Sequence, residues 1–265
     1  MQFDFGKNWL DYSKQALNVD KIQQAKEHFE QLFQHIDLKN KFFLDIGFGQ
    51  GLSLLIAKEK GAIVIGNEIN PTCEEALKQT ATHFPTIQLT EIPLVMGSIL
   101  EQNILEKLTK YSNNEPGFDI VHSWGVLHHT GNMRQALQNA ATLVKPNGYL
   151  VISIYNRHWT SPIWLVIKWL YCHSPKLLQT FLIYSFYPVI WLAKYLFIRQ
   201  NPTQMTRGMN FFYNVIDWIG GYPYEYASLD EIEKLLEKLG FSLVKKIPAQ
   251  VPTGCNEFIF QKQKE

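Results

Sequence analysis

The stretch Phe42-Phe43-Leu44-Asp45-Ile46-Gly47-Phe48-Gly49-Gln50-Gly51 decides the fold of this chain. Its first five residues are apolar apart from Asp45, as expected of a central parallel strand that is covered on both faces. Three glycines follow at alternate positions, and glycine lets the backbone turn sharply and lets a ligand approach the main chain. A helix is predicted from about Leu52 to Lys60, with free N–H groups at its start. The stretch therefore predicts a strand, a tight turn and a helix, with a ligand site at the turn.

Two classes of ligand use such a turn. A dinucleotide fold requires G-x-G-x-x-G, because its pyrophosphate lies on the helix N-terminus. Here the glycines are Gly47, Gly49 and Gly51, and Leu52 stands where the third dinucleotide glycine would be. The Asp45 carboxylate would repel a diphosphate but suits a cationic ligand group. This D-x-G-x-G-x-G pattern resembles motif I of the class I S-adenosylmethionine-dependent methyltransferases, whose cofactor carries an amino group, a sulfonium and no phosphate. The alternative is a glycine-rich turn without a ligand.

Two more strands are predicted to end near this turn. The first covers 62–66 and is followed closely by Glu68, which lies beside the glycine turn if the sheet is doubly wound. The resemblance implies that Glu68 accepts hydrogen bonds from both ribose hydroxyls of the cofactor and that Ile69 contacts the cofactor as well. The second strand, Leu94–Met96, leads to Ser98 at a place where the family often has an acidic residue near the adenine amino group. We assign an adenine contact to Ser98.

A fourth strand, Phe118–Ser123, runs into the segment Trp124-Gly125-Val126-Leu127-His128-His129-Thr130. The pattern F-D-x-V, a short polar-aromatic link and V-L-H-H resemble the fourth motif of the same family. The resemblance implies that Ser123 and Trp124 contact the cofactor.

Histidines supply the candidate general bases. His128 and His129 follow the fourth strand, where this fold binds acceptors, whereas His122 inside the strand is predicted to be structural. An oxygen nucleophile usually needs a general base, while a thiol does not. For His129, a packing or hydrogen-bonding role is as consistent with the sequence as a role facing the acceptor. The quinone-pathway O-methyltransferases tend to have an acidic residue near the position of His128, and because this chain departs from them there we predict no metal site.

Further segments complete the predicted fold. Residues 1–19 show no clear period, but from Asp20 apolar residues recur at spacings of three and four, which predicts a helix beside the sheet. A fifth strand is predicted at 149–155. Ser228 caps a late helix, and two strands follow it. The chain is therefore predicted to be an α/β protein with a Rossmann-like, doubly wound, seven-stranded sheet and helices on both faces.

Three parts are expected along the chain of 265 residues. They are a cofactor-binding core with an N-terminal helix at 1–156, a helical lid insertion at 157–225, and the C-terminal part of the core sheet at 226–265. Residues 177–197 of the insertion contain one charged residue, Lys194, and approach the roughly 20 residues that cross a bilayer. The open interpretations are a substrate lid, a surface that dips into a membrane, a spanning helix, and a buried insertion or dimer contact. The glycines and aromatic residues at 217–225 predict a loop-rich stretch, which is either a connection folded against the site or a rigid packing corner.

The resemblance implies methyl transfer from S-adenosylmethionine to a small acceptor. The many aromatic residues of the insertion favour an apolar or aromatic acceptor, such as a lipid, a quinone precursor or a polyketide. Two alternatives remain at this point. One is a non-catalytic protein that binds S-adenosylmethionine or associates with a membrane, and the other is an NAD-dependent oxidoreductase, against which the glycine spacing argues.

Composition limits the partners and the compartment. The formal net charge is +1 with acids and bases intermixed, so nucleic acid is not expected as a partner. Cys73, Cys172 and Cys255 are scattered, which is typical of reduced thiols in a cytoplasmic protein. The first residues lack the apolar core of a signal peptide. We expect a cytoplasmic protein with peripheral contact at the inner face of a membrane through 160–200, and the oligomeric state stays open.

Overall fold

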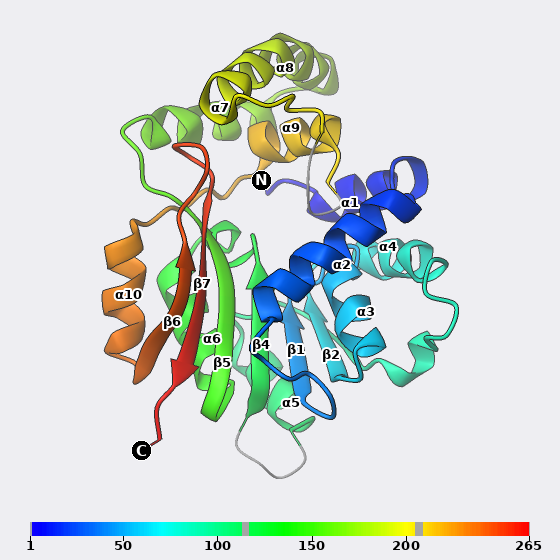
Figure 1. Ribbon diagram of the computed structural model, residues 1–265. Coiled ribbons are helices and arrows are strands. Elements are labelled where there is room, and N and C mark those ends of the chain that lie inside the picture. The colour runs from blue at the N-terminus through cyan, green and yellow to red at the C-terminus, as the bar shows by residue number, and fades with distance from the viewer. Residues whose placement is uncertain (1, 113–116, 205–208, 265) are drawn as a thin grey trace.

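The computed structural model describes residues 2–112, 117–204 and 209–264, so that residues 205–208 of the predicted insertion lie outside the described part. Its centre is a sheet of seven strands: Phe42–Ile46 (β1), Ile63–Glu68 (β2), Leu94–Met96 (β3), Phe118–Trp124 (β4), Val144–Tyr155 (β5), Phe241–Ile247 (β6) and Cys255–Lys262 (β7). The strands lie in the order β3-β2-β1-β4-β5-β7-β6 (Figure 1). The first five pair in parallel, and β7 pairs antiparallel with β5 and β6. The predicted doubly wound, seven-stranded sheet is confirmed.

Helices cover both faces of the sheet because the strands bury side chains on both sides. One face carries α2 (Val19–Phe33), α3 (Leu52–Glu59) and α4 (Thr72–Ala81), and the other carries α5 (Gln102–Thr109), α6 (Met133–Thr142) and α10 (Leu229–Glu237). Successive residues of a strand point to opposite faces. Accordingly, Phe43 of β1 packs in the cluster under α2, while Leu44 packs in the cluster under α5 and α6. The reversal of strand order beside β1 leaves a crevice at the carboxyl ends of β1 and β4.

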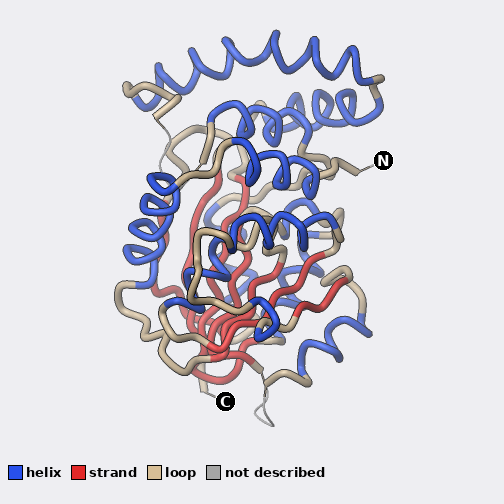
Figure 2. The backbone as a smooth tube through the Cα atoms, turned by 90° about the vertical axis from the view of Figure 1, so that its right-hand side faces the viewer, coloured by secondary structure: helices blue, strands red, loops and turns tan. Residues whose placement is uncertain are grey.

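A further group of helices lies beyond these carboxyl ends: α1 (Phe5–Gln15), α7 (Ser161–His173), α8 (Lys176–Ile198) and α9 (Phe211–Gly220) (Figures 1 and 2). The last three share a small hydrophobic cluster built around Val215 and Ile219 of α9. The longest of them, α8, runs across the outer end of the molecule (Figure 2). By length and composition α8 could cross a membrane.

The structure departs from the sequence-based expectations at three places. Helix α1 was not predicted, because its buried residues, Gly6, Asn8, Tyr12 and Ser13, are mostly small or polar and leave no hydrophobic period. Residues 217–220 were predicted as loop but form the last turn of α9. The Asn210 side chain caps α9 by accepting the N–H of Phe212 at 3.0 Å, and residues at helical spacing bury its inner face. Strand β5 also begins earlier than predicted, at Val144.

Candidate functional site

The glycine turn after β1 is built as the sequence predicts. Gly49 and Gly51 have φ of +56° and +77°, a conformation that residues with a side chain rarely adopt. A Cβ atom on Gly49 would lie 3.1 Å from Nε1 of Trp9, so the indole of α1 covers the turn closely. A Cβ atom on Gly51 would collide with Leu77 of α4. Gly47 and Gly49 therefore line the pocket, whereas Gly51 lets α3 and α4 pack together.

Glu68, at the end of β2, is hydrogen-bonded to the glycine turn. Its Oε2 accepts the N–H of Gly49 at 3.1 Å, and its Oε1 accepts the N–H groups of Ile69 and Asn70 at 2.8 and 3.0 Å. Burial raises the pKa of Glu68, and these hydrogen bonds act in the opposite direction. The carboxylate fixes the shape of the turn and lines the pocket beside it. Its contact with ribose hydroxyls stays a prediction.

Asp45 and His122 form a buried pair across β1 and β4. Oδ1 of Asp45 lies 2.7 Å from Nδ1 of His122, and the two residues are register partners in the sheet. The His122 ring stacks on Trp124, with centroids 5.6 Å apart and an interplanar angle of 7°. All three side chains line the pocket. His122 is therefore part of the candidate site, a place that the sequence analysis did not give it.

The remaining predicted cofactor contacts divide into two groups. Ile69, Ser98 and Trp124 line the same pocket as the glycine turn. Ser123 is fully buried, its Oγ donates to the carbonyl oxygen of Ile46 at 3.0 Å, and among the described residues it does not line the pocket. The Ser123 side chain thus hydrogen-bonds β4 to β1 and is not placed to contact a ligand in the pocket.

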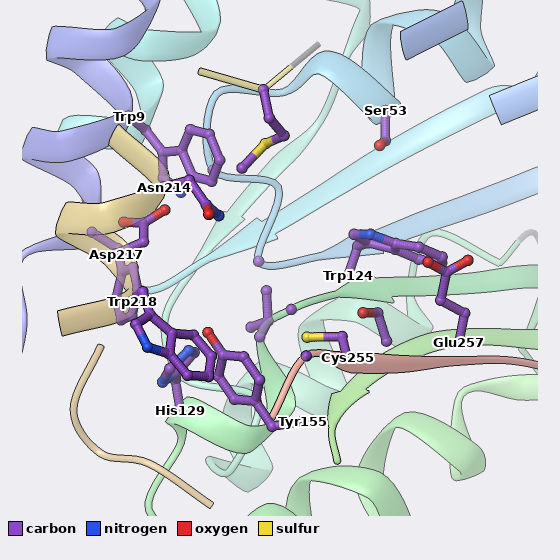
Figure 3. Close-up of a pocket in the computed structure, with 18 of the residues that line it drawn as sticks. Trp9, Ser53, Trp124, His129, Tyr155, Asn214, Asp217, Trp218, Cys255 and Glu257 are labelled. Carbon is purple, nitrogen blue, oxygen red and sulfur yellow. The ribbon is translucent and has the colours of Figure 1, made fainter. Parts of the chain in front are cut away.

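One large cavity connects the glycine turn to helices α7, α8 and α9. Its volume is about 1340 Å³, above the roughly 300–1,000 Å³ of a typical small-molecule pocket. Figure 3 shows Trp9 and Asp217 on one side, Trp124 and Glu257 on the other, and His129 and Tyr155 at its floor. The end away from the glycine turn is lined by apolar residues of the insertion: Trp159, Trp164, Ile190, Phe197 and Trp218. The cavity has room for two small ligands side by side.

His129 lines this cavity. It belongs to a short 3-10 turn, η2 (Leu127–His129), and its Nδ1 lies 2.6 Å from the carbonyl oxygen of Pro223. Because a carbonyl oxygen only accepts, Nδ1 carries the hydrogen and Nε2 keeps a lone pair. Burial, and secondly the charge of Lys168, lower the pKa of His129 to about 3. The imidazole is therefore neutral at physiological pH and can accept a proton, but a pKa this low makes it a weak base in the ligand-free site.

The structure separates His128 from its neighbour. His128 is fully buried, and its Nδ1 accepts the backbone N–H of Tyr155 at 3.3 Å. It is absent from the described lining of the cavity, since consecutive residues of the η2 turn point in different directions. The assignment of His128 as an acceptor-facing base is therefore corrected: it supports the strand end that carries Tyr155.

A buried polar group behind the cavity gave no signal in the sequence. Lys168 of α7 is fully buried, donates from Nζ to the carbonyl oxygen of Trp218, and lies 4.8 Å from the Tyr224 ring centroid. Burial lowers the pKa of Lys168 to about 7 and raises the pKa of Asp217 to about 7. Two segments about 50 residues apart in sequence, α7 and 217–224, supply these groups, so only the folded chain brings them together. Among the described residues, no group of three or more His, Cys, Asp or Glu side chains is placed to hold a metal ion.

Helix α1 contacts both the glycine turn and α9. Asn8 donates from Nδ2 to Oδ1 of Asp217 on α9 at 2.6 Å. Four residues earlier, Oδ1 of Asp4 accepts the side-chain N–H of Asn70 at 2.9 Å, just after β2. With Trp9 over Gly49, the same helix contacts both ends of the cavity.

The buried state of His129 predicts loss of stability in mild acid. The pKa of His129 is about 3 in the folded protein and about 6.5 in an unfolded chain, so the unfolded state takes up the proton first. This contribution is complete above pH 6.5 and is lost as the pH falls towards 3. At pH 4.5 the loss should reach about 2 to 3 kcal/mol of unfolding free energy. Urea unfolding of the wild-type protein and of His129→Gln at pH 7 and at pH 4.5 measures this loss. The free energy of unfolding should fall less in the variant than in the wild type.

The control for this experiment is His35→Gln, since His35 is exposed. This variant should show the wild-type dependence on pH. If the free energy of unfolding falls equally in all three proteins between pH 7 and pH 4.5, His129 is not held neutral by burial.

Comparison with known proteins places the chain in a family. A family model described as a methyltransferase domain matches residues 20–246. The chain is 31% identical over 164 residues to a ubiquinone biosynthesis O-methyltransferase of Coxiella burnetii, and the match covers 62% of this chain and 64% of the relative. It is 26% identical over 153 residues to the protein of the same name from Hydrogenovibrio crunogenus, with 58% of each chain covered. The matches thus span less than two thirds of these relatives.

Solved structures share the fold. The magnesium protoporphyrin IX methyltransferase of Synechocystis PCC 6803 with bound S-adenosylhomocysteine superposes with a TM-score of 0.54 at 13% identity, covering 99% of this chain and 90% of that chain. An O-methyltransferase family protein from Burkholderia thailandensis gives 0.54 at 14% identity, with 92% and 57% covered. At such identities the likeness concerns the fold, whereas the family model covers most of this chain. The chain therefore belongs to the class I S-adenosylmethionine-dependent methyltransferases.

Proposed function

We propose that this protein transfers the methyl group of S-adenosylmethionine to a hydroxyl group of a small, apolar, aromatic acceptor. The observation that carries the proposal is the single cavity, which has backbone and carboxylates at one end, a neutral histidine at its floor and aromatic side chains at the other end. The two ends differ in chemistry, as two different ligands would require. The names of the relatives, ubiquinone biosynthesis O-methyltransferases, support an oxygen nucleophile.

The donor set at the turn fits the cofactor. Gly47 and Gly49 leave room for a ligand against the main chain, and Trp9 closes that space from above. Asp45 and Glu68 are buried carboxylates that suit, respectively, a cationic group and hydroxyl groups. When bound, S-adenosylmethionine supplies an electrophilic methyl group on a sulfonium. The protein then has to align an attacking oxygen behind that methyl group, and alignment is itself a large contribution to rate.

His129 is the residue that we propose as general base. Its Nε2 would accept the proton that the acceptor hydroxyl loses as the oxygen takes the methyl group and the methyl carbon–sulfur bond breaks, leaving S-adenosylhomocysteine. The hydrogen bond to Pro223 holds the ring in place. Tyr155 packs against His129, with centroids 5.4 Å apart, and limits the position of the acceptor ring. The apolar lining beyond them excludes water from the reacting atoms.

For the location of the protein, we propose the cytoplasm with peripheral contact at a membrane through 160–200. Its support is the exposed apolar surface of α7 and α8. A small-molecule acceptor fits this placement, because an apolar molecule accumulates in lipid.

Calorimetry tests the first requirement of the proposed function, which is that the protein binds the cofactor. We expect S-adenosylmethionine and S-adenosylhomocysteine to bind, and NADH to give no heat, because the Asp45 carboxylate disfavours a diphosphate at the turn. Incubation with an alkyl-substituted catechol should then give a methylated product detectable by mass spectrometry. Cofactor binding without turnover on any phenol would support a non-catalytic binding protein, and NADH binding would overturn the assignment of the turn.

A further inference from the structure

Helix α8 has two apolar faces, and the cavity accounts for only one of them. The inner stripe follows helical spacing and lines the cavity: Ile190, Ala193, Lys194, Phe197 and Ile198. The outer face is equally apolar and is exposed: Leu177, Phe181, Tyr184, Val189, Leu192 and Leu196 have 52–85% of their surface accessible. Ile190 is the one buried residue of α8, all of whose residues are described. A helix in water would normally place polar residues on its outer face.

The exposed face continues onto α7 and onto the rim of the cavity. Ile163, Val166, Trp169 and Leu170 of α7 are exposed as well. Trp159 and Phe197 are 77% and 61% exposed, yet both line the cavity. The apolar outer surface and the apolar interior therefore meet at these two side chains. Figures 1 and 2 place the helices at the end of the molecule farthest from the C-terminus.

The charges of this region have one sign. Residues 120–216 contain no aspartate or glutamate, although the whole chain has 24 acidic residues. The basic residues Lys176 and Arg199 stand exposed at the two ends of α8. A surface that joins exposed apolar and tryptophan side chains to basic ends, without any carboxylate, is complementary to an anionic lipid surface.

The inner contacts of α8 hold it against the protein. Nζ of Lys194 donates to Oδ1 of Asn214 on α9 at 2.7 Å and lies 5.6 Å from the Phe211 ring centroid. Crossing a bilayer would break these contacts and place Lys194 in hydrocarbon. Lying in the plane of the membrane keeps them and buries only the outer face.

We propose that the outer face of α7 and α8 docks on an anionic lipid bilayer, and that the acceptor enters the cavity from the lipid between Trp159 and Phe197. The inference rests on the proposed function for the identity of the site, and it adds the partner and the route of the substrate. α8 would lie in the headgroup region with Phe181, Leu192 and Leu196 towards the acyl chains. The cavity mouth then opens into lipid, so an apolar acceptor need not cross water.

The test is cosedimentation of the whole protein with phosphatidylglycerol vesicles and with phosphatidylcholine vesicles. We expect binding to the anionic vesicles, weaker binding to the zwitterionic ones, and a decrease with added salt. The variant Phe181→Ser/Leu192→Ser/Leu196→Ser changes three outer residues that do not line the cavity. Its partition onto phosphatidylglycerol should fall on the order of a hundredfold, because three side chains no longer enter the apolar layer.

The matched control is Val19→Ser/Ile63→Ser/Val244→Ser, which removes exposed apolar side chains from α2, β2 and β6. It should bind vesicles as wild type does. Both variants should bind S-adenosylhomocysteine normally in calorimetry, which shows that they are folded. If the wild-type protein does not bind S-adenosylhomocysteine, the proposed function is wrong, whereas the conclusion from the vesicle experiment is unaffected. Normal cofactor binding without vesicle binding, or a dimer that the outer variant dissociates, would overturn the lipid proposal alone.

Discussion

Gly49→Val should abolish binding of S-adenosylmethionine while the protein stays folded. Gly49 has φ of +56°, and a non-glycine residue in that region costs about 1–3 kcal/mol. A Cβ atom would also lie 3.1 Å from Trp9 Nε1, and the two methyl groups of valine would fill the space between the turn and the indole. The same backbone N–H donates to Glu68, so a shift of the turn would displace that carboxylate too. We expect affinity in calorimetry to fall by more than about a hundredfold.

The chain offers a matched control for backbone strain. Gly240 has φ of +83°, and a Cβ atom there would meet no described atom within 4 Å. It precedes β6 at the end of the sheet opposite to the cavity. Gly240→Val should lose a similar amount of unfolding free energy and bind the cofactor as wild type does. Equal affinity in the two variants would mean that the glycine turn does not hold the ligand.

His129→Gln should lower kcat for methylation of an alkyl-catechol by about 10²- to 10⁴-fold, the usual contribution of a general base. Glutamine keeps a polar side chain of similar reach but has no basic nitrogen. Affinity for S-adenosylhomocysteine should be unchanged, because the histidine lies apart from the glycine turn. Rates across a range of pH would then show whether the remaining reaction follows ionisation of the catechol itself.

The adjacent histidine provides the comparison. His128→Gln removes an imidazole that is fully buried and does not line the described cavity. It should lower the free energy of unfolding but leave kcat within roughly tenfold of wild type at a temperature where it is folded. If both variants lose kcat equally, the proton acceptor is not His129 alone.

The sequence predicts the cofactor end of the cavity better than the acceptor end. A positive φ strongly favours glycine, so the turn at Gly47, Gly49 and Gly51 is visible in a single sequence. Glu68 follows from the rule that parallel strands end together at the switch point. The sequence does carry a sign that Asp45 and His122 are paired. Each is a polar residue inside an apolar central strand, and β1 and β4 are neighbours in the sheet.

The acceptor end depends on contacts between distant segments. Whether His128 or His129 faces the cavity is decided by the direction of a short turn, which no local pattern specifies. Asn8 and Asp217 are more than two hundred residues apart, yet they share a hydrogen bond. Lys168 looks like a solvent-facing lysine of an apolar helix until the fold encloses it with aromatic rings. Such placements follow from tertiary packing.

The double contact of α1 has a consequence for the order of events in a catalytic cycle. Trp9 covers the glycine turn, and the preceding residue, Asn8, donates a hydrogen bond to Asp217 of α9. A cofactor held between Trp9 and the glycine turn, as we propose, would be released when this helix moves, and that movement would also break the hydrogen bond from Asn8 to Asp217 of α9. We therefore expect an ordered mechanism, in which the cofactor binds first and its demethylated product departs last. Turnover would then be limited by the rate at which one short N-terminal helix detaches and returns.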